Sequence, residues 1–385
     1  MTQAPPLAAS SRVRPPAGYD CILLASFGGP EGAEDVLPFL RNVTRGRDIP
    51  PERLEVAAHH YRHFGGVSPI NAQNRALQAA LAAELDARGL ALPVYLGNRF
   101  WAPYFADALL ELHAHGHRRV LVLVTSAFSS YSGCRAYRED LAQALAETGL
   151  ERDLVVDKVR QYFDHPGFVG SNAAAVLGGL RQLADAGAGS SPHVIFSAHS
   201  IPVSAAEASG PRESLPSGQA GPAGEGGWYG AQLREVAALI MDSVRPECGD
   251  VPWSLAFQSR SGPPAQPWLQ PDINEAIRAV PEGTSGLVVS PLGFVSDHME
   301  VQWHLDNEAA LTARERGVPM VRVPTAGIDP QFVAGLVDLI RERTEGAPRR
   351  AVTELGPWQD ICPADCCLGP SPKPTIAGCQ PQRRA

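Results

Sequence analysis

The chain has 385 residues, of which 44% are hydrophobic and 19% charged, and its formal net charge is −8. This length predicts two domains with enough apolar side chains for a core. The negative charge argues against a nucleic-acid-binding surface, which needs a basic face. No stretch holds the roughly 18 apolar residues of a membrane span. The Pro- and Ser-rich N-terminus lacks the apolar segment of a signal peptide, so we expect a cytoplasmic protein whose residues 1–18 form a disordered arm.

Short apolar runs rich in Val, Ile and Leu alternate with longer helical patterns. Continuous apolar runs are typical of strands buried on both faces of a parallel sheet. The helical patterns include residues 71–88, with leucines four apart and a glycine stop, and residues 168–184. The eight apolar runs are 21–27, 94–96, 120–124, 154–156, 194–197, 253–257, 286–290 and 320–323.

The eight runs divide into four before Asp164 and four after it. This arrangement predicts an α/β protein of two similar Rossmann-like halves, each a doubly wound parallel sheet, with a cleft between them. We expect the halves to span 19–165 and 166–345, followed by a Cys-rich tail over 346–385. A Gly-, Ser- and Pro-rich loop over 204–227 interrupts the second half.

A candidate catalytic histidine follows the fifth apolar run. The run ends at Ser197, and His199 comes at its C-terminal tip. Ligands of doubly wound folds bind beyond the carboxyl ends of the strands. An imidazole with a pKa of about 6.5 can accept a proton or ligate a metal there. A histidine that only hydrogen-bonds within a loop is the alternative interpretation.

A row of metal-ligating side chains follows the seventh run. We expect a helix to begin near residues 296–297, and α-helical spacing then places Glu300, His304 and Glu308 on one face. Carboxylates and imidazoles together suit a borderline divalent metal, so the row predicts a path along which such an ion passes. A solvated face with ion pairs is the alternative. The polar residues at the helix start are Asp297 and His298.

Two loops of the first half offer polar groups at strand ends. A glycine pair and Ser68 form a tight turn before the helix over 71–88, and their amides and hydroxyl can hold a carboxylate. The loop over 128–138 combines hydroxyls, an arginine and Tyr137, which suit a flat ligand that carries carboxylates. Taken singly, a helix-capping turn and an ordinary polar loop explain these segments equally well.

Together these segments resemble the ferrochelatases, class II chelatases that insert iron into porphyrins. The resemblance covers about residues 20–345. It depends most on Phe-Ser-Ala-His-Ser-Ile-Pro at 196–202 and Gly-Phe-Val-Ser-Asp-His-Met-Glu at 293–300. The other matching segments are 25–30, 65–69, 257–263 and 267–269. It implies a chelatase-type fold and a lyase-type metal chelatase of heme biosynthesis.

The resemblance also implies roles for single residues. His199 and Glu300, expected on strand tips of opposite halves, would face each other across the porphyrin and bind Fe²⁺. His199 would also take the two pyrrole protons that leave for each iron. Ser68 and Tyr137 match porphyrin-contacting positions, and Arg45 and Arg47 would reach its propionates. The residues expected to deliver iron or to lie behind it are Asp297, His298, His304 and Glu308.

The sequence departs from the family at Phe27, beside the porphyrin. Many Gram-positive members that act on coproporphyrin III have a tyrosine there that can ligate product iron. Phenylalanine cannot, so His199 becomes the first candidate for an axial ligand. The lack of a long apolar lip and the actinobacterial character of the chain favour coproporphyrin III as substrate and coproheme as product. A protoporphyrin IX ferrochelatase, a chelatase for another metal and a non-enzymatic tetrapyrrole or metal carrier stay open.

Four of the seven cysteines lie in the tail. Some ferrochelatases hold a [2Fe–2S] cluster with one internal and three tail cysteines, and Cys134 matches the internal position. The resemblance therefore implies such a cluster, against the alternative of a disordered tail with redox-prone thiols. Cys21 and Cys248 are expected to be a core residue and a loop thiol. The implied ligands are Cys134, Cys362, Cys366 and Cys367, with Cys379 as the substitute for one of the adjacent pair.

The expected partners follow from this assignment. They are coproporphyrin III, ferrous iron and other enzymes of the heme pathway, with no nucleic acid and no membrane span.

Overall fold

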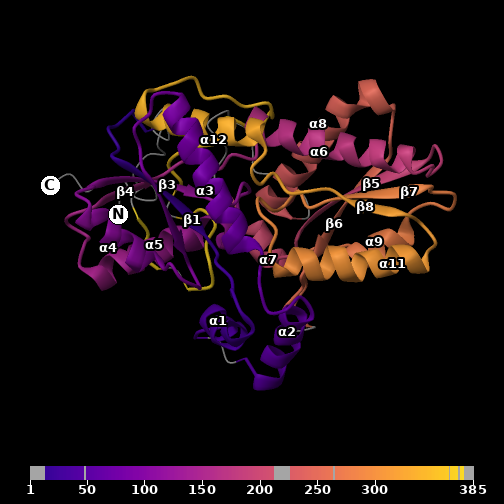
Figure 1. Ribbon diagram of the computed structural model, residues 1–385, viewed down its shortest axis with the longest axis horizontal. Coiled ribbons are helices and arrows are strands. Elements are labelled where there is room, and N and C mark those ends of the chain that lie inside the picture. The colour runs from indigo at the N-terminus through magenta and orange to yellow at the C-terminus, as the bar shows by residue number, and fades with distance from the viewer. Residues whose placement is uncertain are drawn as a thin grey trace, which may run out of the picture.

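The computed structural model describes residues 14–46, 49–211, 226–262, 265–363, 365–371 and 373–376. Two parallel four-stranded sheets lie side by side in it (Figure 1). The first, in the order β2-β1-β3-β4, contains β1 (Cys21–Ser26), β2 (Val94–Asn98), β3 (Arg119–Val124) and β4 (Val155–Lys158). The second, in the order β6-β5-β7-β8, contains β5 (Pro192–His199), β6 (Trp253–Gln258), β7 (Gly286–Ser290) and β8 (Met320–Arg322). All eight predicted strands and their division into four and four are confirmed.

Helices connect the strands and cover both faces of each sheet, as parallel crossovers require. The predicted helices over 71–88 and 168–184 are confirmed as α3 and α6. The helices of the first half are α1 (Val36–Val43), α2 (Pro51–His63), α3 (Ile70–Ala87), α4 (Phe105–Ala114) and α5 (Ala136–Thr148). Those that follow are α6 (Pro166–Asp185), α7 (Val203–Glu207), α8 (Gly227–Cys248), α9 (Ile273–Ala279), α10 (Met299–Val301), α11 (Ala310–Glu315) and α12 (Pro330–Thr344). η2 (Ala33–Asp35) is a short 3₁₀-helix, and η3 (Tyr131–Arg135) and η4 (Gln302–Ala309) are π-helices.

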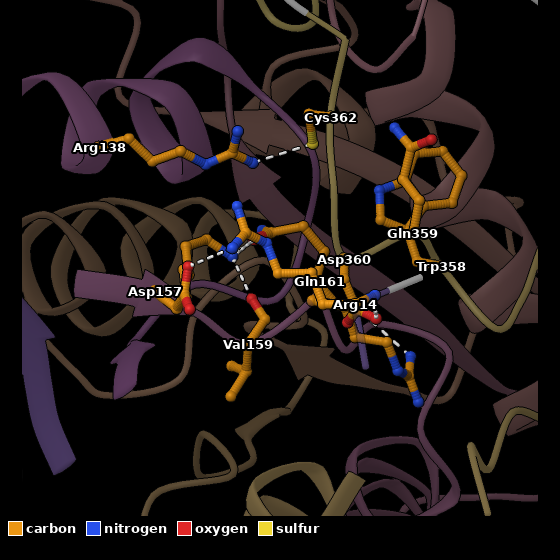
Figure 2. A pocket seen from close by; sticks show the side chains of 11 residues that line it. Arg14, Arg138, Asp157, Val159, Gln161, Trp358, Gln359, Asp360 and Cys362 are labelled. Atoms are coloured by element: carbon orange, nitrogen blue, oxygen red, sulfur yellow. Dashed lines mark hydrogen bonds and ion pairs between the residues drawn. The ribbon is translucent and has the colours of Figure 1, made fainter. Parts of the chain in front are cut away.

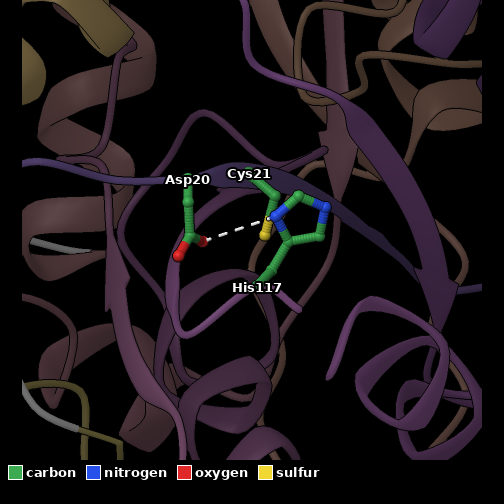
Figure 3. Close-up of side chains that lie close together, drawn as sticks. All are labelled: Asp20, Cys21 and His117. Carbon is green, nitrogen blue, oxygen red and sulfur yellow. Dashed lines mark ion pairs between the residues drawn. The ribbon is translucent and has the colours of Figure 1, made fainter. Parts of the chain in front are cut away.

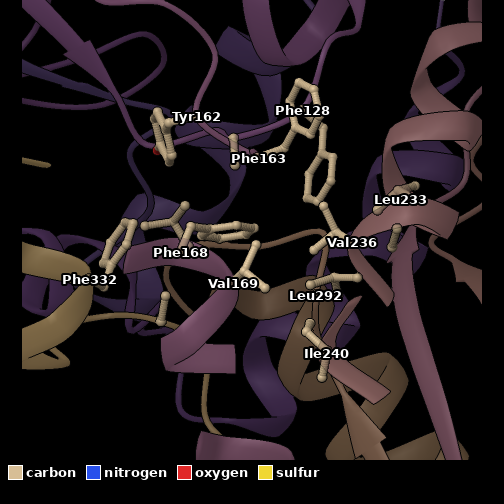
Figure 4. Packing of buried hydrophobic residues seen from close by; sticks show 14 of the residues in the cluster. Phe128, Tyr162, Phe163, Phe168, Val169, Leu233, Val236, Ile240, Leu292 and Phe332 are labelled. Carbon is tan, nitrogen blue, oxygen red and sulfur yellow. The ribbon is translucent and has the colours of Figure 1, made fainter. Parts of the chain in front are cut away.

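Alternate side chains of each strand enter different cores, because successive residues of a strand point to opposite faces. Ile22 and Leu24 of β1 and Val194 and Phe196 of β5 enter the same cluster. The intervening residues of these strands enter a separate core in each half. Figure 4 shows part of the shared cluster, where Phe128 and Phe163 of the first half approach Phe168, Leu233 and Leu292 of the second. The two halves are therefore joined by one apolar core.

The end of the chain returns to the first half. α12 packs against α3 as well as α6, and Trp358 beyond it is 1% exposed between Phe163 and Trp228. The predicted arm over 1–18 lies largely outside the described residues, and Arg14 near its end pairs with Asp157 at 2.9 Å. Among the described residues, none of the helices has the length and apolar character to cross a membrane.

Candidate active site

His199 and Glu300 form an ion pair at the carboxyl edge of the second sheet. β5 ends at His199, and α10, which begins at Met299, carries Glu300 in its first turn. The imidazole Nε2 lies 3.3 Å from the carboxylate Oε2, and the two side chains keep 33% and 42% of their surface exposed. An imidazole and a carboxylate, both still accessible, are thus available to one ligand atom.

This geometry corrects the predicted placement of the pair. His199 and Glu300 do not come from opposite halves, because β5 and β7 are neighbours in one sheet. Nor can a porphyrin lie between them as they stand, since a ring would need about 3.5 Å on each side and the two atoms are 3.3 Å apart. The prediction was wrong because the fifth and seventh apolar runs form neighbouring parallel strands, so the segments that follow them lie side by side rather than facing each other. Both groups therefore address one face of a ligand.

The backbone around His199 determines which ring nitrogen is basic. Nδ1 lies within hydrogen-bonding distance of the carbonyl oxygen of Ser200. A carbonyl only accepts, so Nδ1 carries the hydrogen and Nε2 is left to face Glu300. The hydroxyl of Tyr229 donates to the carbonyl of His199 at 3.0 Å, and the Ser200 amide donates to the carbonyl of Gln258 at 2.7 Å. The imidazole is therefore oriented by α8 and β6 as well as by its own strand.

Gly293 lets the loop after β7 approach β5. A Cβ at this position would lie 2.7 Å from the Cα of Ala198, which no side chain tolerates without a backbone shift. The Gly293 amide donates to the carbonyl of Ser197 at 3.0 Å. Gln258 adds a second link, since it accepts from the Ser197 hydroxyl at 2.8 Å and donates to the carbonyl of Glu300 at 3.1 Å. These contacts bring the two functional side chains together.

The pair shifts the pKa values of its members in opposite directions. Burial lowers the pKa of His199, but Glu300 and the Ser200 carbonyl outweigh burial, and the net pKa is raised. Burial raises the pKa of Glu300, but His199 outweighs it, and the pKa falls to about 2. Glu300 is therefore ionised at neutral pH, and it favours a proton or another cation on Nε2.

The helix that carries Glu300, His304 and Glu308 begins later and is wound more widely than predicted. α10 begins at Met299, and residues 302–309 form a π-helix rather than an α-helix. The i→i+5 bonding of a π-helix changes which side chains meet. Glu308 accepts from Trp303 at 2.9 Å through one oxygen, and its other oxygen lies 2.8 Å from Nδ1 of His304. His304 and Glu308 are thus a second imidazole–carboxylate pair.

Histidines of α2 pack against this π-helix, and the sequence analysis assigned them no role. The ring of His60 stacks on Trp303 with centroids 4.0 Å apart, and it lies 6.3 Å from the ring of His304. His59 and His63 contact the edge of the same indole. Burial and His304 lower the pKa of His60, which keeps its imidazole neutral. The sequence signal that could have indicated their role is the presence of three histidines within five residues.

Asp297 and His298 have local partners. The Asp297 carboxylate pairs with Arg322 at 3.1 Å, and Arg322 also pairs with Asp306. His298 is the N-cap of α10, where its Nδ1 accepts the amide of Glu300 at 3.2 Å. Burial lowers its pKa, which keeps the acceptor unprotonated. Both residues therefore hold the loop and helix that carry Glu300.

Polar residues of α3 connect the first half to the loop that precedes Glu300. Asn74 accepts from the Ser296 hydroxyl at 2.8 Å and donates to the Ser26 hydroxyl at the end of β1. The amide of Asp297 donates to Gln73 at 2.7 Å. The end of β1 is consequently held close to the site of the second half.

The predicted porphyrin-binding residues have different environments. Phe27 is half-buried and lies near the rings of buried Phe39 and half-buried Phe100, with centroids 6.3 and 4.6 Å away. Ser68 and Tyr137 are 3% and 4% exposed, so little of either surface is open to a ligand. The guanidinium of Arg99 lies over the rings of Phe100 and Tyr137, at 4.7 and 4.9 Å. Arg45 follows α1 and hydrogen-bonds Asn42 at 2.7 Å, whereas Arg47 lies outside the described residues.

The four predicted cluster cysteines meet in one buried group. Cys134, Cys362, Cys366 and Cys367 are each at most 3% exposed. Hydrogen bonds connect Cys134 to Cys362 and Cys367, and connect Cys366 to the same two thiols. Cys367 has a φ of 55°, a left-handed conformation that is rare outside glycine. Cys379 lies outside the described residues.

Arg138 supplies positive charge to this group. It donates to the sulfur atoms of Cys134 and Cys362 at 3.0 and 2.9 Å, beside a polar pocket that also contains Arg14 and Asp360 (Figure 2). The thiols of Cys362 and Cys367 donate toward Cys134 and, with Arg138, hold its pKa well below the usual range. The Gly210 amide donates to Cys367 at 3.0 Å. Four buried sulfurs with cationic and amide donors fit a thiolate-bound metal group.

Comparison with known proteins gives consistent matches. The ferrochelatase family model matches residues 19–344. A coproporphyrin III ferrochelatase of Leifsonia xyli subsp. xyli is 53% identical, covering 99% of this chain and 100% of the relative. One of Streptomyces griseus subsp. griseus is 52% identical, covering 96% and 98%. A ferrochelatase of Rhodopirellula baltica is 48% identical, covering 94% and 97%. The sirohydrochlorin chelatase SirB of Bacillus subtilis subspecies spizizenii, with cobalt, aligns at a TM-score of 0.45 and 9% identity over 85% of this chain and 95% of that chain.

Proposed function

Because the chain belongs to the ferrochelatase family, we propose that it inserts Fe²⁺ into coproporphyrin III to give coproheme. The observation that carries this proposal is the ion pair of His199 and Glu300, 3.3 Å apart and still accessible. A porphyrin must lose two N–H protons as it gains one Fe²⁺. The site therefore needs a base and a metal ligand at the ring, and this pair contains both.

In the proposed reaction, Nε2 of His199 accepts the pyrrole protons in turn. Its other nitrogen donates to the Ser200 carbonyl, so only Nε2 is free to act as a base. The ionised carboxylate of Glu300 stabilises the imidazolium that forms, since opposite charges at this distance favour the charged form. Each proton then passes to solvent, and the iron takes the place of both on the four ring nitrogens.

Iron delivery is assigned to the side chains that continue from Glu300. His304 and Glu308 form a hydrogen-bonded pair, and His60 adds a neutral imidazole from α2. Fe²⁺ accepts mixed imidazole and carboxylate ligands, so this row suits an ion that is to be passed on. Asp297 and His298 contribute by holding the start of α10.

The choice of coproporphyrin III is supported by the relatives, several of which carry that substrate in their names. Its four carboxylates require more cationic partners than the two of protoporphyrin IX. Arg45 and Arg47 are the proposed partners, with Phe27 against the ring. Ser68 and Tyr137 are proposed to lie directly behind this surface, because little of either side chain is exposed. The proposal includes a cytoplasmic location and the transfer of product to heme-pathway enzymes. It also includes domain boundaries at residues 18, 165 and 345.

The decisive experiment is anaerobic iron insertion with the two porphyrins at matched concentrations. We expect turnover with a higher kcat/KM for coproporphyrin III. Equal or better turnover of protoporphyrin IX overturns the substrate assignment but leaves the reaction. Binding of porphyrin and iron with no turnover indicates a carrier and overturns the reaction itself.

We also propose that Cys134, Cys362, Cys366 and Cys367 hold a [2Fe–2S] cluster. When bound, the cluster supplies four iron–thiolate bonds and a redox-active centre. The chain contributes the buried thiols, the Arg138 charge and the Gly210 amide, and in this way ties the tail to the start of α5.

The cluster proposal is tested by metal analysis and absorbance of the purified full chain. We expect visible absorbance and about two irons per chain before substrate is added. Cys367→Ser should lose both, whereas Cys248→Ser, which changes a half-buried thiol elsewhere, should keep them. A colourless, iron-free but active wild-type protein would remove the proposal, as would zinc in place of iron.

A further inference from the structure

A second group of metal-ligating side chains lies at the opposite edge of the first sheet. Asp20 directly precedes β1, Cys21 is its first residue, and His117 lies two residues before β3. One ligand atom from each of the three lies within 4.8 Å of the other two (Figure 3). These residues stand at the amino ends of strands whose carboxyl ends face the active site, so the group is separate from that site.

The ligand atoms are held in place without a metal. The carboxylate of Asp20 accepts the backbone amides of Arg118 and Arg119 at 2.8 and 3.1 Å. Cys21 is fully buried, whereas the side chains of Asp20 and His117 are 40% and 18% exposed. Two of the three candidate ligands are therefore in contact with solvent, and the buried sulfur lies within 4.8 Å of both.

The hydrogen bonds of His117 favour the tautomer that a metal needs. Its Nε2 lies 3.1 Å from the hydroxyl of Tyr95, which lies 2.7 Å from Nδ1 of His115. If Tyr95 donates to His115, it accepts from Nε2–H of His117, and Nδ1 of His117 keeps its lone pair. The reverse chain would put a hydrogen on Nδ1, 3.8 Å from Asp20 and beyond hydrogen-bonding distance.

We propose that Asp20, Cys21 and His117 bind a zinc ion, with water as the fourth ligand. Bond lengths of about 2.0–2.3 Å in a tetrahedral site place ligand atoms roughly 3.3–3.6 Å apart, a few tenths less than the 3.8 Å between Nδ1 of His117 and Asp20. The Zn²⁺ charge is balanced by one thiolate and one carboxylate, and the thiol proton leaves to solvent on binding. The ion joins the start of β1 to the turn before β3.

Zinc binding to the full chain tests this site against matched variants. Bound zinc is measured by equilibrium dialysis at fixed free Zn²⁺, with thermal midpoints measured in parallel. His117→Ala and Cys21→Ser should each bind one ion fewer than wild type and lose the zinc-dependent rise of the midpoint. His113→Ala, on the neighbouring α4, and Cys248→Ser should behave as wild type. Zinc at the active site or the tail cysteines is common to all five proteins and cancels in the comparison.

Two further measurements keep the result independent of folding. Tyr95→Phe leaves the three ligands in place but removes the hydroxyl that contacts Nε2 of His117 and Nδ1 of His115, and it should weaken zinc affinity about tenfold. Co²⁺ should give a thiolate charge-transfer band that is larger in Cys248→Ser than in Cys21→Ser. The proposal is overturned if a folded His117→Ala protein binds as much zinc as His113→Ala, or if the cobalt band is equal in the two cysteine variants.

Discussion

The two halves of the chain share one strand order but differ in the chemistry at their strand ends. β1 and β5 hold the second place in their sheets, and β3 and β7 the third. In the second half these strands lead to His199 and Glu300, whereas in the first half they lead to Phe27 and Thr125, which do not titrate near neutral pH. The first half instead contributes aromatic rings and the hydrogen bonds of Asn74.

This difference separates what topology supplies from what residue choice supplies. A parallel sheet brings the loops of neighbouring strands to one edge in both halves, yet among the described residues an imidazole–carboxylate pair lies at this edge in the second half and none lies there in the first. The histidines of α2 enter the site by reaching across from the first half to Trp303. Four substitutions test how differently the two halves contribute to iron insertion.

The largest effect is expected for His199→Ala. It removes the proposed base while leaving the first half untouched, and kcat/KM for iron insertion should fall about 10²–10⁴-fold. Anaerobic formation of the metalloporphyrin absorbance measures it, with His113→Ala as a histidine control remote from the site. Activity close to wild type would mean that the proton acceptor lies elsewhere.

Gly293→Ala should act through the position of Glu300. The added Cβ would meet the Cα of Ala198 at 2.7 Å, so the loop must move. A displacement of roughly 1 Å at reacting groups costs about 10²-fold in rate, and overpacking costs about 1–3 kcal/mol of unfolding free energy. Rates and urea unfolding are compared with Gly178→Ala on α6, where a Cβ meets no atom within 4 Å. Equal behaviour of the two variants would disprove the close approach.

Glu300→Gln should shift the pH profile. The carboxylate raises the pKa of His199, so in the wild type the base stays protonated to higher pH, and kcat/KM rises as pH increases through that pKa. Without the charge, only the Ser200 carbonyl opposes the effect of burial, so the pKa of His199 falls and the rising limb moves to lower pH. The maximal rate falls as well, through loss of a proposed metal ligand. The kcat/KM profile measures it, and a limb that stays in place or moves upward would contradict the coupling.

The smallest effect is expected for Phe27→Leu, the change at the first-half position that corresponds to the His199 tip. Replacing one apolar side chain by a smaller one in a binding pocket is expected to change transition-state binding by about 1 kcal/mol, the lower end for such a change, which is less than about tenfold in kcat/KM. The same insertion assay measures it. A loss as large as that of His199→Ala would show that the first half takes a direct part in the chemistry.

Local pattern was sufficient for the elements and for the main pair. Apolar runs and their spacing predicted eight strands in two sets because strand burial depends on neighbouring side chains along the chain. His199 was singled out because it directly follows the fifth run, and Glu300 because a short loop and an expected helix start follow the seventh. The residues that would contact the porphyrin were harder to predict from the sequence. Tyr137, for example, is buried in the core rather than open to a ligand.

What the sequence determined by itself is the α/β class and the two halves, and its resemblance to the ferrochelatases singled out His199, Glu300 and the four cysteines. Tertiary structure alone decided that His199 and Glu300 share one sheet edge and that His60, Arg138 and His117 reach their partners. The reason is physical. Strand and helix periodicities act between neighbours in the chain, whereas these contacts join segments far apart in it and depend on how the sheets and helices pack.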